Sequence, residues 1–278
     1  MLFEPLPHLR ALLFDGPDAS SFLQSQLTSD LRALRIGACQ LTSWCNAQGR
    51  MISFGLLAQE SELRFVWVVP AGEAAQLLTR LTMFKFRAKL TIKLDTREVA
   101  QVCDTPGAGR FASVTPADGE GYWRLPDGRC LRLFAPSLET DPQPTEFCSS
   151  HAWHLADVRA KLPWSAGGER FVAQVLGLHT LGALSLSKGC YPGQEVIARI
   201  HYKGGVKRTL VHLVTQATEA FECPLKMLGI DGTEAGEILQ AVSSGKLGTQ
   251  LLCVVASDAK LPLLAAVNHR NITLSLAC

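Results

Sequence analysis

The sequence predicts an α+β fold with antiparallel sheets, divided into two or three compact units. Short apolar segments are separated by turn-forming residues, which is typical of hairpins. Helical segments occur among them without the regular strand–helix–strand crossovers of a parallel sheet. The chain has 278 residues, more than one ordinary hydrophobic core serves.

The amino-terminal part alternates predicted strands with two amphipathic helices. A strand-like segment at 10–16 precedes a helix that starts at Asp18, a residue suited to the N-cap. Apolar residues within this helix are spaced as on one buried face. Further strands are predicted at 39–44, 51–57 and 63–69, and a second helix at 72–84.

The middle of the chain changes in composition. Residues 104–146 are rich in Pro, Gly and Asp, which suggests a second unit or a large insertion. A helix is predicted at 145–159, and "KLP" ends it. From Thr209 onward, short strand-like runs separated by Gly, Asp or Asn indicate a small antiparallel barrel.

These changes divide the chain into three predicted domains. The first is an α+β domain at 1–100, completed by part of 145–200. The second is an α+β domain at 101–205, and the third is a β-barrel at 206–278.

Composition excludes several classes of protein. Hydrophobic residues make up 47% and charged residues 19%, as in soluble globular proteins. The net charge of +2 argues against a surface covered with nucleic-acid-binding charge, so a polyanion site must be a local patch. The first residues do not resemble a secretory signal, and no apolar run is long enough to cross a bilayer. We expect a cytoplasmic protein without membrane contact.

The cysteines and histidines predict neither a disulfide framework nor a metal site. There are nine cysteines, an odd number, and no CxxC pair. This usage fits a reducing cytoplasm. His151 and His154 could share one face of the predicted helix, but they lack a third ligand, so no metal is expected.

The segment "KGCYPGQE" at 188–195 is the strongest local feature. Its glycines and proline restrict the backbone and hold Cys190 in a defined loop. A nearby cation, Lys188 or Arg199, would favour the thiolate, which makes Cys190 the candidate catalytic residue. His201 is a candidate base. The alternative is that Cys190 is a small buried hydrophobic residue in a tight turn.

Positive charge also gathers in this part of the chain. The single acid there is Glu195, and the cations are Lys188, Arg199, Lys203, Lys207 and Arg208. Such a cluster can bind a phosphate or a chain of carboxylates. A solvated surface without a ligand is the alternative interpretation.

The same window resembles the signature of the YgfZ family, folate-binding relatives of the glycine-cleavage T-protein. The matching residues are Lys188–Glu195, Ala198–Arg199 and Tyr202–Arg208. Three further segments resemble, in order, the family's amino-terminal helix, its hairpin turn and a short strand: Gly16–Asp30, Cys45–Met51 and Lys85–Leu90.

The resemblance implies a three-part, ring-like protein that holds tetrahydrofolate or a derivative in a central channel. Trp153 occupies the position of a family tryptophan that stacks on the folate. The folate-binding residues implied are Trp153, Lys188, Tyr191, Gln194, Glu195 and Arg199, with Lys203, Lys207 and Arg208 as an anion patch for the glutamate tail. Cys190 would face the reactive part of the ligand. Alternatively, Trp153 is an ordinary core residue.

Three departures from the family pattern bear on activity. Ser53 and Phe54 stand where aminomethyl-transferring T-proteins have an acidic pair, which argues against glycine cleavage. Residues 159–161 read Arg-Ala-Lys where many relatives have Glu-Ala-Gly, so a carboxylate contact to the pterin is either lost or supplied elsewhere. Leu9 replaces a second tryptophan of one branch.

The function predicted first is a folate-binding accessory protein that supports iron–sulfur cluster assembly or repair and tRNA modification. Its partners would be iron–sulfur enzymes or cluster-assembly proteins. A folate-dependent aminomethyl or methyl transferase is the alternative, favoured if Asp15, Asp30 or Asp157 places a carboxylate near the folate nitrogens. A third hypothesis, direct RNA binding, is opposed by the near-neutral charge, so no nucleic-acid contact is expected. Whether any reaction is catalysed stays open.

Overall fold

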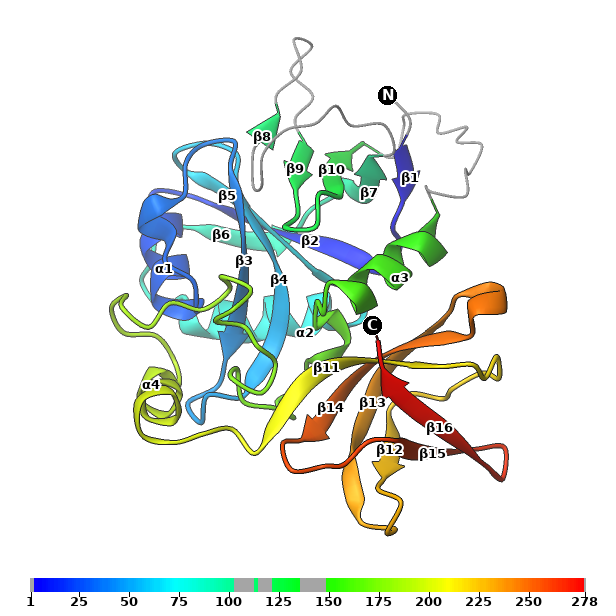
Figure 1. Cartoon of the computed structure of the whole chain (residues 1–278). Helices are drawn as coiled ribbons and strands as arrows, with labels where there is room; N and C mark the ends of the chain where they lie inside the picture. Colours follow the sequence, from blue (N-terminus) through cyan, green and yellow to red (C-terminus); the bar gives the residue numbers. More distant parts are fainter. Residues whose placement is uncertain (1–2, 103–112, 115–121, 136–148, 278) are drawn as a thin grey trace.

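The computed structural model describes residues 3–102, 113–114, 122–135 and 149–277. Its strands form two five-stranded sheets and a closed barrel, and the recorded strand pairs are antiparallel. The predicted α+β class, the antiparallel pairing and the carboxy-terminal barrel are therefore confirmed (Figure 1). Within the described ranges, no helix is long and apolar enough to cross a bilayer.

The first sheet has the strand order β3-β4-β5-β2-β6. Its strands are β2 (Leu9–Asp15), β3 (Cys39–Cys45), β4 (Met51–Gln59), β5 (Arg64–Pro70) and β6 (Thr91–Leu94). Helices α1 (Ala19–Gln26) and α2 (Ala71–Phe84) bury Phe22 and Leu77 in the hydrophobic core on one of its faces. A second core on the other face includes residues of α3 and of the segment that follows it. Because both faces are covered, β4 is apolar and buried along nearly its whole length.

The second sheet has the order β1-β7-β10-β9-β8. Its strands are β1 (Phe3–Pro5), β7 (Glu98–Val102), β8 (Ser113–Val114), β9 (Tyr122–Arg124) and β10 (Cys130–Phe134). Strand β1, where the described residues begin, thus pairs with β7 and lies in the second sheet. Much of the predicted insertion at 104–146 lies outside the described residues.

Helix α3 (Ser150–Arg159) lies between the second sheet and the barrel (Figure 1). The side chain of Ser149 caps it by accepting a hydrogen bond from the backbone N–H of Ala152 at 3.0 Å. The helix packs against β13 and β14 of the barrel. It begins later than predicted, and residues 145–148 lie outside the described part of the chain.

The barrel closes in the order β11-β14-β13-β12-β15-β16. Its strands are β11 (Arg208–Thr215), β12 (Leu225–Leu228), β13 (Glu234–Ser243), β14 (Thr249–Ala256), β15 (Leu263–Val267) and β16 (Arg270–Leu276). Alternate residues such as Leu251 and Cys253 fill its interior, as the period of two along a strand requires. Short 3-10 turns occur at Leu31–Ala33, Trp164–Ala166 and Gly245–Leu247.

Two segments differ from what the sequence predicts. Residues 85–90, expected as a short strand, form a turn in which Phe86 has a positive φ of 45°, and β6 begins only at Thr91. The basic segment after Cys190, interpreted as a loop, contains helix α4 (Gln194–Lys203). Its β-branched residues weaken the helical signal in the sequence, although they recur at helical spacing.

Candidate functional site

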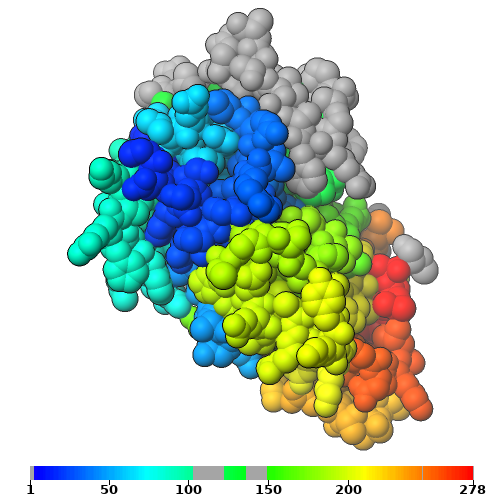
Figure 2. All heavy atoms as spheres, turned by 90° about the vertical axis from the view of Figure 1, so that its left-hand side faces the viewer, coloured from blue at the N-terminus to red at the C-terminus, as the bar shows by residue number. Residues whose placement is uncertain are grey.

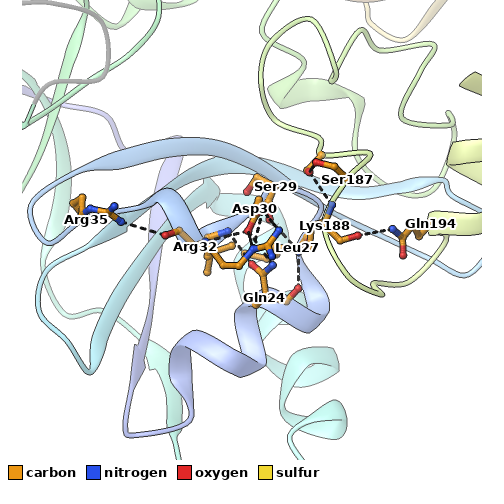
Figure 3. A network of polar contacts seen from close by, with 11 residues as sticks. Gln24, Leu27, Ser29, Asp30, Arg32, Arg35, Ser187, Lys188 and Gln194 are labelled. Carbon is orange, nitrogen blue, oxygen red and sulfur yellow. Dashed lines mark hydrogen bonds and ion pairs between the residues drawn. The ribbon is translucent and has the colours of Figure 1, made fainter.

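We call residues 188–195 the signature segment, and Lys188 holds it against the end of α1. Its side chain is 3% exposed, and its ammonium donates hydrogen bonds to the carbonyl oxygens of Gln24, Leu27 and Ser29 at 2.5, 2.6 and 3.0 Å (Figure 3). An ammonium group has three protons, so all of them are used within the protein. Burial lowers the pKa of Lys188 to about 8, and Asp30 opposes this shift. Although predicted as one of the cations near Cys190 that attract the glutamate tail, Lys188 is buried.

The residues on either side of Cys190 are also anchored. The hydroxyl of Tyr191 donates to the carbonyl oxygen of Ser185 at 3.1 Å, and the amide of Gln194 donates to that of Lys188 at 2.8 Å. The Lys188 ammonium also lies 5.2 Å from the centre of the Tyr191 ring. Cys190 itself is exposed. The segment therefore presents a thiol to solvent from a well-anchored backbone.

The backbone at position 193, immediately before α4, requires a glycine. Its φ is 82°, a conformation that other residues rarely adopt. A Cβ atom at this position would also lie 2.4 Å from the carbonyl oxygen of Asn46 and 2.6 Å from the backbone of Gly49. The signature segment is thus packed directly against the β3–β4 turn, another segment that resembles the family pattern.

The other predicted cations are at the surface. Arg199 and Lys203 are exposed on α4, Lys207 and Arg208 are exposed at the start of β11, and Glu195 is exposed in the first turn of α4. Arg208 forms an ion pair with Glu234 of the barrel at 3.3 Å. No ion pair is recorded for Arg199, Lys203 or Lys207 within the described residues, and all three side chains are exposed to solvent.

A cavity of about 560 Å³ lies beside the signature segment. Its lining includes Asp30, Ser185, Ser187, His201 and Tyr202. The ring centre of His201 is 5.2 Å from that of His179 and 4.9 Å from that of Tyr202. The role of His201 as a base for Cys190 stays a prediction.

Trp153 lies in a second polar cluster, on α3. The indole is 1% exposed, and the guanidinium of Arg129 stacks 4.0 Å from its ring centre. Arg129 also donates to the Trp153 carbonyl oxygen and to a carboxylate oxygen of Asp157, each at 2.7 Å. The indole nitrogen is buried and has no hydrogen-bond partner. We call the set His8, Arg129, Trp153, His154 and Asp157 the α3 junction.

The titratable groups of the α3 junction have unusual environments. Burial raises the pKa of Asp157 to about 7, while Arg129 acts in the opposite direction. The rings of His8 and His154 lie 4.2 Å apart, and His8 Nε2 is buried without a partner. Burial, followed by the effect of His154, lowers the pKa of His8 to about 4. Gln240 of the barrel lies 3.4 Å from His154 Nδ1.

The predicted site residues therefore fall into two groups. Lys188, Tyr191 and Gln194 share one hydrogen-bonded segment, whereas Trp153 has its polar contacts in the α3 junction. Trp153 and Tyr191 belong to the same hydrophobic core. The contributions of His8 and Arg129 were not predicted. Nothing in the sequence pattern places either residue near α3.

The two positions where aminomethyl-transferring T-proteins have an acidic pair carry no ionisable group here. Ser53 and Phe54 are fully buried, and the Phe54 ring meets that of Trp164 edge-on at 5.2 Å. Glycine cleavage therefore cannot rely on an acid at either position.

Only one of the three candidate carboxylates is next to Trp153. Asp15 pairs with Arg64 and Asp30 with Arg32, each at 2.6 Å. Asp157 is 2% exposed and shares Arg129 with Trp153. Across the described parts of the chain, no group of three or more His, Cys, Asp or Glu residues is arranged to hold a metal ion.

Comparison with known proteins gives consistent matches. Residues 5–103 match the GCVT N-terminal domain family. The chain is 29% identical over 276 residues to the tRNA-modifying protein YgfZ of Edwardsiella ictaluri, covering 87% of this chain and 81% of the relative. It is 27% identical over 293 residues to the YgfZ protein of Colwellia psychrerythraea, covering 96% and 89%.

A solved structure shows the same fold. The crystal structure of glycine cleavage system aminomethyltransferase T from Bartonella henselae superposes with a TM-score of 0.73, covering 99% of this chain and 84% of that one. The sequence identity is 17%, so this similarity concerns the fold alone.

Proposed function

Because this chain belongs to the YgfZ family, we propose that it is a folate-binding accessory protein that supports iron–sulfur cluster assembly or repair and, through it, tRNA modification. The names of its relatives support the link to tRNA modification. Its T-protein-like fold supports a folate-related ligand. The cytoplasm is the proposed compartment, and iron–sulfur enzymes or cluster-assembly proteins are the proposed partners.

The observation that carries the folate proposal is a pair of buried, unpartnered nitrogens in the α3 junction. They are Nε1 of Trp153 and Nε2 of His8. Leaving such a group without a hydrogen bond costs about 1–3 kcal/mol. A pterin is a flat heterocycle with ring N–H groups, an amino group and a carbonyl oxygen, so it suits these groups chemically. These two groups support a pterin-like ligand at this site.

Each predicted residue has a distinct role in this proposal. Trp153 stacks on the pterin or aminobenzoyl ring, with its other face covered by Arg129. Asp157 donates a hydrogen bond when neutral and accepts one when ionised, and its pKa of about 7 allows both states near neutral pH. These two residues orient the ring system.

The glutamate tail and the thiol belong to the signature segment. The exposed cations Arg199, Lys203, Lys207 and Arg208 attract the tail, with Glu195 at their edge. Lys188, Tyr191 and Gln194 act as positioning residues that hold the backbone around Cys190. Bound tetrahydrofolate would supply one-carbon chemistry, and Cys190 would supply thiol or cluster chemistry.

The accessory role is tested by rescue of a strain that lacks the protein. Cys190→Ser should leave the fold intact and abolish recovery of iron–sulfur-dependent tRNA modification, measured by mass spectrometry of tRNA nucleosides. Cys223→Ser is the matched control, since it also removes an exposed thiol. Full rescue by Cys190→Ser would return Cys190 to a structural role.

A folate-dependent aminomethyl or methyl transferase is a second candidate function, favoured by Asp157. A carboxyl group with a pKa near 7 is suited to general acid–base catalysis at neutral pH. Transfer of an isotope-labelled one-carbon group from an aminomethyl donor to tetrahydrofolate would support it. The transfer should be lost in Asp157→Asn. Absence of transfer by wild-type protein that binds folate would leave the accessory role.

A further inference from the structure

A basic edge lies on the first sheet, where the chain passes from α2 to β6. We define it as Lys85, Phe86, Arg87, Lys89 and Lys93. Residues 81–94 include no Asp or Glu. In Figure 2 this part of the chain, coloured teal, projects at the side of the molecule, away from the yellow segment around 200. The basic edge is thus separate from the cations around α4.

Phe86 is held outward in a backbone conformation unfavourable for a bulky residue. Its φ is 45°, and a hydrogen bond from the Ala88 N–H to the Lys85 carbonyl oxygen at 2.9 Å closes the turn around it. Glycine adopts a positive φ at little cost, whereas a bulky residue is strained there. The Phe86 side chain is 85% exposed, so packing within the protein does not compensate. Such strain is typical of functional positions.

The charges of the basic edge are available to a partner. Arg87, Lys89 and Lys93 are exposed, and Lys85 is partly buried. Within the described residues, none of these four side chains forms an ion pair.

Acidic side chains also lie near the basic edge, and Asp95 interacts with Lys93 while it forms an ion pair with Arg97 at 2.7 Å. Asp18 accepts a hydrogen bond from the backbone N–H of Lys89 at 2.7 Å, and Asp15 pairs with Arg64. The basic edge therefore keeps a local positive excess that the net charge of the chain conceals.

We propose that the basic edge binds an unpaired stretch of RNA. One base stacks on the Phe86 ring, and the phosphates on either side of it meet Lys85 and Arg87, the neighbours of Phe86 in sequence. Lys89 and Lys93 extend the path for the backbone. An exposed aromatic ring between cations is the combination that single-strand-binding proteins use. The surface indicates an unpaired nucleic acid, and the choice of RNA over DNA rests on the proposed function.

The surroundings of the basic edge favour RNA over a membrane surface. An interfacial helix inserts an apolar face into the headgroup region. The apolar face of α2 is already used, because Leu77 and Leu81 are buried against the first sheet. The ring of Phe84 also meets that of Trp44 edge-on at 5.8 Å. Met83 and Phe84 at the end of α2 are also exposed, at 68% and 42%, but Phe86 is the most exposed of the three at 85%. It also has a cation on either side of it in sequence, which suits one stacked base.

The proposal is tested by fluorescence anisotropy with a labelled oligouridylate. Wild-type protein should bind the single strand, and its affinity should fall steeply between about 50 and 200 mM salt. Phe86→Ala should weaken binding about 5- to 150-fold, the range for loss of one stacked base. Each of Lys89→Gln and Lys93→Gln should reduce the slope of log affinity against log salt by about 0.7.

Two controls separate binding from folding. Phe86→Gly should lose binding in the same way while its melting temperature stays equal or rises, because glycine adopts this φ without strain. Ile230→Ala removes another exposed apolar side chain, 70% exposed, at the barrel and should change nothing. Folate binding by Phe86→Ala should equal that of wild type, so failure here is distinguishable from failure of the folate proposal.

Four results would overturn the RNA proposal. The first is no binding of the oligouridylate at low salt, and the second is equal binding by Phe86→Ala. The third is tighter binding of duplex RNA or of oligodeoxythymidylate than of the oligouridylate. The fourth is binding to vesicles of anionic lipid without binding to RNA.

Discussion

Lys188 shows how one side chain of a motif can be mistaken for a ligand-binding group. In the sequence it is one of five cations near Cys190 and looks available to an anion. In the structure its charge is buried and solvated by three carbonyl oxygens, with Asp30 as the acid that favours its charged form. Removing a buried cation of this kind leaves the carbonyl groups without partners.

Lys188→Met should therefore lower the free energy of unfolding by about 3 kcal/mol or more, because the orphaned groups include the buried carbonyl of Leu27. Urea denaturation gives this free energy directly. Lys203→Met is the matched control, since Lys203 is exposed in the same motif, and its effect should stay within about 0.5 kcal/mol. Equal effects of the two substitutions would show that Lys188 is not a structural tie.

Asp157 should make stability depend on pH in a defined window. Its folded pKa of about 7 exceeds the ordinary 3.8, so its contribution is fully present below pH 3.8 and is lost as pH rises to 7. The Asp157→Asn variant has no carboxyl group at this position, so its stability does not fall for this reason as pH rises. The free energy of unfolding of the variant minus that of wild type should therefore increase between about pH 4 and pH 7.

His8 and His154 act in the opposite sense, because their lowered pKa values make stability fall as pH drops below 6.5. Both histidines remain in Asp157→Asn. Subtracting the wild-type free energy of unfolding from that of the variant therefore removes the histidine contributions to first order. The control is Asp231→Asn, an exposed aspartate whose pKa is lowered by Thr233, and its difference should be flat from pH 4 to pH 7. A flat difference for Asp157→Asn would place that carboxyl in an ordinary environment.

At the scale of elements, the sequence predicts what periodicity encodes. The apolar faces of α1 and α2 and the alternation in the barrel strands are local patterns, and those elements form close to where they are expected. The turn at 85–90 and helix α4 depart from expectation. Neither the positive φ of Phe86 nor the packing of the β-branched residues of α4 produces a periodic pattern in the sequence. Local sequence pattern therefore predicts the regular helices and strands well, but it does not predict the turn at 85–90 or helix α4.

The candidate site also has a part that local sequence pattern predicts and a part that depends on tertiary structure. Asp157 lies one helical turn after Trp153, so their proximity is readable from a predicted helix. Arg129 precedes β10 and His8 lies between β1 and β2, so their arrival at α3 depends on tertiary structure. No sequence motif or spacing links Arg129 or His8 to α3, so neither could be assigned to the site from the sequence.

The anchored signature segment should make Cys190 the most reactive of the described thiols. Cys190 is exposed, whereas Cys39 and Cys45 are buried and burial raises the pKa of each to about 12. Cys223 is exposed, but desolvation raises its pKa to about 11. Brief alkylation by iodoacetamide at neutral pH, followed by peptide mass spectrometry, should label Cys190 first. Faster labelling of Cys223 would contradict the assigned environments.

At the scale of the molecule, the α3 junction lies where the β1–β2 turn, the second sheet and the barrel meet. His8 comes from the β1–β2 turn, Arg129 from the second sheet, and Gln240 from the barrel. Arg170 and Glu237 add an ion pair between the segment after α3 and the barrel. A ligand held by α3 would therefore contact the place where the three parts of the chain meet. This position supports the folate proposal together with the two unpartnered nitrogens.

The most direct test is titration calorimetry of wild type and Trp153→Phe with tetrahydrofolate carrying one or several glutamates. Phenylalanine keeps an apolar ring in the core and removes the unpartnered indole N–H. Tyr202→Ala is the control, because Tyr202 lines the separate cavity beside the signature segment.

Wild-type protein should bind the ligand, and more tightly with several glutamates. Trp153→Phe should lose about 1 kcal/mol, roughly fivefold in affinity, while Tyr202→Ala binds as wild type does. Unchanged affinity in Trp153→Phe together with lost binding in Tyr202→Ala would contradict a folate site at the α3 junction.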